Sequence, residues 1–165
     1  MATPMLDEFK QEAATTRRVL ERVPTEKLTW KPHPTSMSLG QLSMHIATVP
    51  GAIAGLAQLD GFDVSQANFA PPQPEGIDQV LAAFETSFKT AEEYLSGADE
   101  DSLSKTWTMT AGDKEIMSVP RAGLVRQIML NHWYHHRGQL SVYLRILEVP
   151  IPVIYGPSGD ENPFA

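Results

Sequence analysis

The longest periodic stretch of the chain is PRAGLVRQIMLNHWYHHRGQLSVYLRILE, residues 120–148. Its opening proline suits the first turn of a helix, and the Val149-Pro150 pair that follows it is typical of a helix end. Apolar residues recur through the stretch at helical spacing, which predicts one long amphipathic helix. Three of the five histidines of the chain fall inside this helix, so it bears on both the fold and the function.

Three earlier segments carry the same helical periodicity, namely residues 3–23, 38–59 and 77–96. Pro50 lies inside the second segment, and we predict a kinked helix there because the apolar pattern continues beyond it. The linker of residues 61–76 contains three prolines and is long enough for a crossover. Four helical segments predict an all-α fold, specifically a four-helix bundle with long crossover connections.

Two shorter segments lack this period. Residues 104–119 read as two short strands around a turn, which predicts a β-hairpin before the last helix. The tail of residues 149–165 contains four prolines and no periodicity. We nevertheless expect it to pack on the bundle, because it carries the apolar side chains of Ile151, Val153, Ile154 and Tyr155.

Length and charge exclude several classes of protein. The 165 residues predict one domain over residues 1–165, and 13 Lys+Arg against 20 Asp+Glu give a net charge of −7. This acidic chain has no basic cluster, which argues against a nucleic-acid partner. We see no membrane span and no secretory signal, and expect a cytoplasmic protein. With zero cysteines, any transition metal must be held by His, Asp or Glu.

The histidines of the last helix can be placed on its helical wheel. At about 100° per residue, Val125 and Tyr143 lie within about 20° of His132, which puts His132 at the centre of an apolar face. His136 lies about 40° from His132 on that face, in register for one metal ion. His135 lies about 60° to the other side, at the edge of the face.

His45 occupies a similar place on the second helix, with apolar residues within about 40° on either side. Three imidazoles in an apolar interior are costly unless they are hydrogen-bonded or share a cation. We therefore predict that His45, His132 and His136 form a divalent-metal site with an open coordination position, as in catalytic zinc sites. His33 lies in a proline-containing loop and is expected to face solvent.

Simpler interpretations of the histidines stay open. A single histidine on an apolar face is more often a hydrogen-bonded core residue than a ligand, and an H-x-x-x-H spacing alone is weak evidence. The three side chains would then form a polar core layer in a structural homodimer. Alternatively, they hold a metal or a small ligand without catalysis.

Residues beside the histidines extend the prediction. Gln139 lies about 20° from His132, facing inward, where it is placed to orient a ligand or a metal-bound histidine. Arg137 lies about 140° away and is expected at the surface or at an interface. A second apolar patch of Leu130, Trp133 and Leu144 predicts either a dimer interface or a face covered by the hairpin or the tail.

Together, His45, the motif HWYHHRGQL at residues 132–140 and the tail VPIPVIYGPSGDE at residues 149–161 resemble the DinB/YfiT-like family of metal-dependent enzymes. The resemblance implies a four-helix bundle, a homodimer, and a divalent ion, zinc or nickel, on His45, His132 and His136. It also makes Asp160 and Glu161 candidate general bases, with solvated surface charges as the alternative.

The resemblance implies less about the reaction. Some relatives are thiol-dependent S-transferases that use bacillithiol or mycothiol, and others are described as hydrolases. The lack of cysteine is compatible with transfer, because the sulfur would arrive with the cosubstrate. The expectation is thus a metal-dependent transferase or hydrolase that acts on a small molecule, with a low-molecular-weight thiol as candidate cosubstrate.

Overall fold

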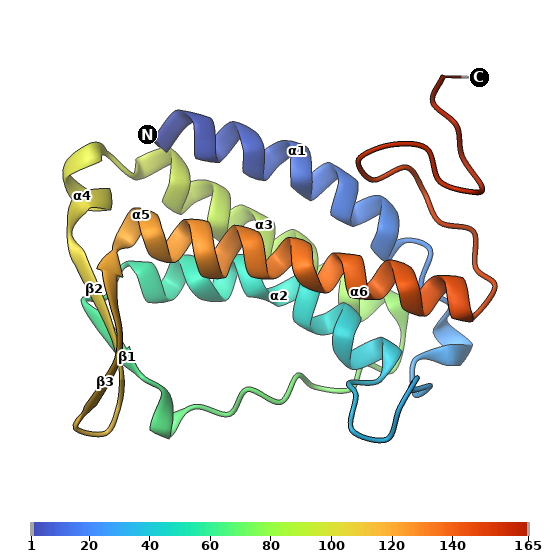
Figure 1. The fold of residues 1–165 in the computed structure, drawn as a ribbon, viewed down its shortest axis with the longest axis horizontal. Coiled ribbons are helices and arrows are strands. Elements are labelled where there is room, and N and C mark those ends of the chain that lie inside the picture. The colour runs from blue at the N-terminus through green and yellow to red at the C-terminus, as the bar shows by residue number, and fades with distance from the viewer. Residues whose placement is uncertain (1, 165) are drawn as a thin grey trace.

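The computed structural model describes residues 2–164 and is mostly helical, with one small sheet (Figure 1). The earlier helices are α1 (Ala2–Leu20), α2 (Leu39–Ala57), α3 (Ile77–Gly97) and the short α4 (Glu100–Ser104). The last long helical segment consists of α5 (Arg121–Leu124), a π-helical segment (Val125–Asn131) and α6 (His132–Ile146). Short 3-10 turns occupy Thr25–Lys27 and Val64–Gln66.

The long helical segments lie side by side around one core (Figure 1). The linker between α2 and α3 runs back along the length of the molecule, so that these two helices point in the same direction. The helix α2 continues through Pro50 as predicted, and Ser38 and Gln41 form a capping box at its start.

The sheet is larger than the predicted hairpin. Strands β2 (Thr106–Ala111) and β3 (Lys114–Pro120) pair antiparallel, which confirms the hairpin. A third strand, β1 (Gly61–Asp63), pairs parallel to β2 at the start of the linker. A Cβ at Gly61 would lie 2.4 Å from the carbonyl oxygen of Thr108, so this close pairing needs a glycine. The predicted all-α class is therefore corrected to a mostly helical fold with a three-stranded sheet.

The predicted second apolar patch is buried within the chain. Leu130 and Leu144 are fully buried, and Trp133 is 1% exposed. The ring of Trp133 packs on Phe9 of α1, with 5.6 Å between ring centroids. Because the protein's own first helix covers this face, the patch offers no dimer interface.

Arg137 lies in the middle of the same buried stripe, which corrects its predicted place at the surface or at an interface. Its side chain is 1% exposed and forms an ion pair with Glu12 of α1 at an N–O distance of 2.5 Å. It also donates to the Thr16 hydroxyl at 3.0 Å and to the Tyr155 hydroxyl at 2.6 Å. The Arg137 guanidinium can be buried because it has polar partners on α1 and the tail. The helical wheel of a single helix does not show these partners.

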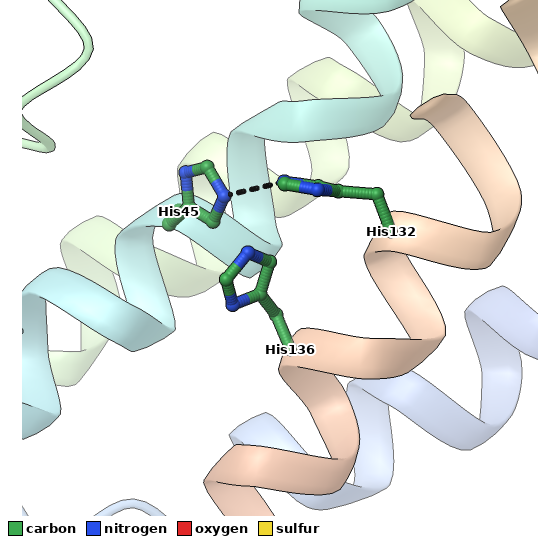
Figure 2. A group of neighbouring side chains, drawn as sticks. All are labelled: His45, His132 and His136. Atoms are coloured by element: carbon green, nitrogen blue, oxygen red, sulfur yellow. Dashed lines mark hydrogen bonds between the residues drawn. The ribbon is translucent and has the colours of Figure 1, made fainter. Parts of the chain in front are cut away.

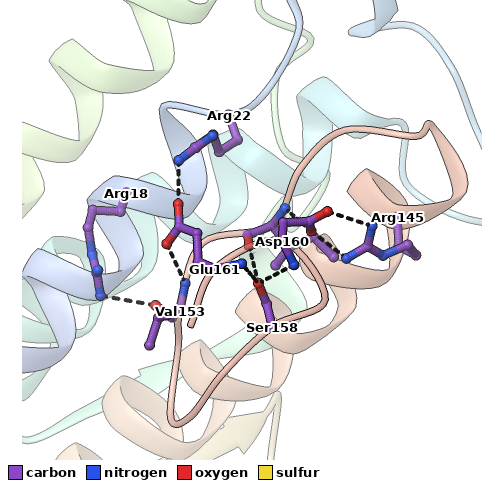
Figure 3. Close-up of polar contacts among 8 residues, drawn as sticks. Arg18, Arg22, Arg145, Val153, Ser158, Asp160 and Glu161 are labelled. Carbon is purple, nitrogen blue, oxygen red and sulfur yellow. Dashed lines mark hydrogen bonds and ion pairs between the residues drawn. The ribbon is translucent and has the colours of Figure 1, made fainter. Parts of the chain in front are cut away.

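The tail packs on the helices through apolar contacts of Ile151 and Ile154 with the core, as predicted. Figure 3 shows the polar contacts that hold it. The Asp160 carboxylate accepts from the Ile151 N–H at 2.8 Å and pairs with Arg145. The Glu161 carboxylate accepts from the Val153 N–H at 3.0 Å and pairs with Arg22. Both carboxylates thus fasten the tail.

Among the helices of residues 2–164, none combines the length and the apolar character needed to cross a membrane.

Candidate metal centre

Three histidines from two helices converge in the structure (Figure 2). His45 comes from α2, and His132 and His136 come from successive turns of α6. One ring nitrogen of each lies within 4.8 Å of the others, and the Nε2 atoms of His45 and His132 are 3.0 Å apart. The His136 ring centroid is 4.4 Å from each of the other two. In proteins, nitrogen ligands lie about 2.0–2.1 Å from a zinc ion, so this grouping is compatible with one divalent ion.

A hydrogen bond beside the histidines sets the register between α2 and α6. Pro50 has no N–H to donate to the Ile46 carbonyl one turn earlier in α2. The indole Nε1 of Trp133 donates to that carbonyl instead, at 2.8 Å. Since Ile46 follows His45 and Trp133 follows His132, the bond holds the two histidine-bearing turns against each other.

The third helix supports α2 on the other side of Pro50. The Gly51 N–H donates to the Ser87 hydroxyl of α3 at 2.7 Å, and the Ser87 hydroxyl donates to the Thr48 carbonyl at 3.3 Å. A Cβ at Gly51 would lie 2.8 Å from the Ser87 Cα, so the helices approach too closely for a larger residue. The turn that carries His45 is therefore fixed by neighbours on both sides of the proline.

The π-helical segment Val125–Asn131 ends immediately before His132. A π-helix has more residues per turn than an α-helix, so the residues before His132 do not follow the α-helical wheel used for the prediction. Ile128 lies beside His132 and His136 in the wall of a cavity, whereas Met129 is fully buried. Such segments often occur at functional sites, and the sequence contains no proline or glycine within this one to indicate it.

The histidines form part of the wall of a cavity of about 690 Å³, and they are partly buried. This corrects the predicted position of His132 at the centre of the buried face of the last helix, with His136 beside it. The most buried face is the one that carries Trp133 and Arg137, about 100° and 140° from His132 on the helical wheel. The error arose because this helix has apolar residues on several faces.

Burial affects the protonation of all three rings. Burial, together with the neighbouring His136 and His132, lowers the pKa of His45 from 6.5 to about 4. Burial is also the main cause that lowers the pKa of His132 and that of His136. The rings are thus neutral near pH 7, which is the form that binds a metal.

Gln139 contacts the centre from one turn further along α6. Its Oε1 lies 2.8 Å from His136 Nδ1, and its Nε2 lies 3.0 Å from His135 Nε2. An amide oxygen only accepts, so His136 Nδ1 carries the proton and His136 Nε2 keeps its lone pair. The amide nitrogen in turn donates to His135, so Gln139 links an exposed histidine to a histidine of the centre.

The other predicted residues lie elsewhere. His33 is exposed and contacts Thr35, and Asp160 and Glu161 hold the tail. No carboxylate is found among the described residues that line the cavity. The histidines are therefore the only titratable groups among those described lining residues.

The fold and the site together define a class, the mostly helical proteins in which histidines from two helices form a candidate divalent-metal centre. Within that class, the chain belongs to the DinB family, whose family model matches residues 1–162.

Three known proteins are similar to this chain along most of its length. An uncharacterized protein of Bacillus subtilis, YrdA, is 24% identical over 160 residues, which cover 94% of this chain and 89% of YrdA. A DinB-like protein from Bacillus cereus has a similar crystal structure, with a TM-score of 0.72 and 21% identity over 92% of this chain and 95% of that one. The crystal structure of the DinB-like protein YjoA of Bacillus subtilis has a TM-score of 0.71 and 20% identity, over 92% of this chain and 96% of YjoA. At these identities, the two crystal structures support the fold.

Proposed function

We propose that this chain is a metal-dependent enzyme built on a four-helix bundle, in which His45, His132 and His136 hold one divalent ion. The observation that carries the proposal is the convergence of three ring nitrogens within 4.8 Å at the wall of a cavity. A structural core layer of histidines would not need a cavity of about 690 Å³ beside it.

The chain's own residues fit such an ion. All three rings are neutral near pH 7 because burial lowers their pKa values. The His136–Gln139 contact leaves Nε2 of His136 free to coordinate. Three nitrogen ligands without thiolate suit zinc or nickel, the two metals that the family resemblance also suggests.

The cavity favours a thiol over water as the group that the site activates. An ion bound to the histidines would supply Lewis acidity, which lowers the pKa of a coordinating group. A thiol needs a smaller shift than water, because its ordinary pKa is about 8.5 against about 15.7 for water. With no carboxylate among the described lining residues to take a proton from water, we propose S-transfer to a small electrophile as the reaction.

In this reaction a C–S bond forms between the thiol cosubstrate and an electrophilic carbon. The thiol proton leaves to bulk water, and the bond from carbon to the leaving group breaks. The histidines would hold the ion that activates the thiol, and the apolar wall excludes water from the reacting sulfur. Hydrolysis of esters or amides is the alternative reaction to be tested in parallel.

The metal is tested by elemental analysis of the purified protein after loading with zinc or nickel. We expect one ion per chain in the wild type and in the His33→Ala control, and loss of the ion in His45→Ala and His136→Ala. Activity is tested by conjugation of small thiols to a chromogenic aryl halide, with ester hydrolysis as the comparison. A wild-type chain that binds no ion, or conjugation unchanged in His136→Ala, would contradict the proposal.

The homodimer is a separate proposal that rests on the family resemblance. Light scattering on the purified chain tests it, and a mass near 18.2 kDa would contradict it.

A further inference from the structure

The cavity beside the histidines has a wall of two kinds. The histidines form a polar part of it, and most of the remaining wall is apolar. The side chains that form this apolar wall come from α2, the linker and the π-helical segment, and include Val49, Ile53, Leu56, Phe62, Phe69 and Ile128. A ligand that fills the cavity would therefore bury most of its surface against hydrocarbon.

The linker wall of the cavity is fixed at both ends. Near its start, the Asp63 carboxylate accepts from the Gly112 N–H in the hairpin turn at 3.0 Å. Near its end, Gln73 accepts from the Ser38 hydroxyl at 2.6 Å and donates to the Leu28 carbonyl at 3.1 Å. The linker is thus held across the cavity before any ligand arrives, which lowers the ordering cost of binding.

Phe69 lies between these two anchors in the sequence, and its exposure is unusual for a large apolar side chain. It lines the cavity, yet it is 67% exposed. An exposed aromatic ring at a cavity wall gains favourable burial when an apolar ligand covers it. This position makes Phe69 a contact that a ligand completes.

The wall offers no partner for a charged ligand. Among the described lining residues there is no Asp, Glu, Lys or Arg. The Thr48 hydroxyl already donates to the Met44 carbonyl at 2.9 Å, and Asn68, whose Oδ1 accepts from the Ala70 N–H at 3.0 Å, offers a charged ligand only an uncharged amide. A carboxylate or phosphate buried along this wall would pay a desolvation penalty without an opposite charge to offset it.

We propose that the cavity binds a substrate that is largely uncharged and apolar. The polar, reacting end of this substrate lies at the histidines, and its hydrocarbon portion lies against the linker and Phe69. The identity of the reacting end rests on the proposed function, but binding of the apolar portion does not require the ion. The substrate class is a neutral alkyl or aryl compound, and charged thiols with several carboxylates are disfavoured.

The test uses the full chain, both metal-loaded and treated with a chelator. The neutral fluorophore N-phenyl-1-naphthylamine reports on the cavity, and n-alkanols from butanol to octanol displace it. We expect the affinity of the alkanols to rise about fourfold for each added methylene. In the chelated protein, n-alkanoates of the same chain length should bind about tenfold more weakly than the alkanols.

Variants place the binding in this cavity. Phe69→Ala should weaken octanol binding about tenfold, because most of a ring contact is lost. Ala52→Trp, at an exposed position that lines the cavity, should abolish probe binding by filling it. Ile116→Ala is the control, since Ile116 of β3 is 51% exposed and does not line the cavity.

The outcomes separate this inference from the proposed function. Absence of a chain-length trend, or equal effects of Phe69→Ala and Ile116→Ala, overturns the apolar-ligand proposal even when the chain binds an ion. A normal trend in a chain that binds no ion supports the apolar-ligand proposal and contradicts the metal-dependent enzyme.

Discussion

The indole Nε1 of Trp133 donates to the main-chain carbonyl of Ile46 at 2.8 Å, and this carbonyl is the one that Pro50 leaves without its helical donor. A side chain of α6 thus replaces the missing donor of α2. The two bonded residues are the chain neighbours of His132 and His45.

This relationship predicts a non-additive effect on stability. Trp133→Phe removes the donor and leaves a buried carbonyl unpaired, which should lower the free energy of unfolding by about 1–3 kcal/mol in addition to the lost ring contacts. Pro50→Ala restores an N–H that can reach Ile46, so Trp133→Phe should cost less in that background. Urea unfolding of the wild type, both single variants and the double variant measures the coupling. Strictly additive effects would contradict it.

Gln139 is predicted to act through His136. Gln139→Ala should weaken zinc binding about 10- to 100-fold, because His136 loses the acceptor that fixes its Nδ1 proton and ring orientation. Gln139→Glu keeps an acceptor and should retain most of the affinity. Competition with a chromogenic zinc chelator measures this, and Gln127→Ala is the matched control, since Gln127 is exposed on the same helical segment. Equal affinities in Gln139→Ala and Gln127→Ala would refute the role.

The metal-free protein should lose thermal stability as the pH falls from 6.5 towards 4. Burial and the neighbouring rings of His136 and His132 lower the pKa of His45 in the folded chain from 6.5 to about 4. In this window the unfolded chain binds a proton that the folded chain excludes, so stability is full above pH 6.5 and declines below it. The lowered pKa values of His132 and His136 act in the same direction.

Melting temperatures of chelated protein between pH 4.5 and 7.5 check this prediction. His45→Gln should flatten the decline, because it removes the ring whose pKa is lowered to about 4 in the folded chain. His33→Gln should leave the decline as in the wild type, since His33 is exposed. Identical slopes in the two variants would show that His45 does not contribute.

The buried ion pair of Arg137 and Glu12 should contribute far more to the free energy of unfolding than a more exposed ion pair that also involves α1. Glu12→Gln leaves a guanidinium that is 1% exposed without its carboxylate, which should cost about 3–5 kcal/mol of unfolding free energy. Glu92→Gln, which breaks the more exposed Lys10–Glu92 pair, should cost about 0–1 kcal/mol. Arg137→Met in the Glu12→Gln background should recover part of the loss. Chemical denaturation of the four proteins gives the comparison.

Much of the fold follows from local sequence patterns. The capping residues, the apolar period and the proline positions predict the main helices, and the turn around Gly112 predicts the hairpin. The strand β1 was missed because three residues carry no readable alternation, and its partner β2 lies far along the chain. The π-helical segment was missed because its apolar residues recur in the sequence at the same spacing as those of an α-helix.

The same holds for the candidate site: spacing within one helix was predicted, and the contacts of Arg137 with distant elements were not. The i and i+4 spacing of His132 and His136 predicted that they lie together, and the structure brings His45 to them. Arg137 was misplaced because its partners Glu12 and Tyr155 come from other elements. The cavity was not predicted at all, because its linker wall depends on how the segment between α2 and α3 is anchored.

The distance along the chain between His45 and His132 has a consequence for how the centre is assembled in the cell. The two rings meet across 87 positions, and the last helix carries two of the three histidines. Until the last helix is synthesised, the growing chain contains only one of these three histidines, His45. The proposed ion therefore cannot reach its full set of ligands before that helix is made, and premature termination before it yields a product that lacks two of the three.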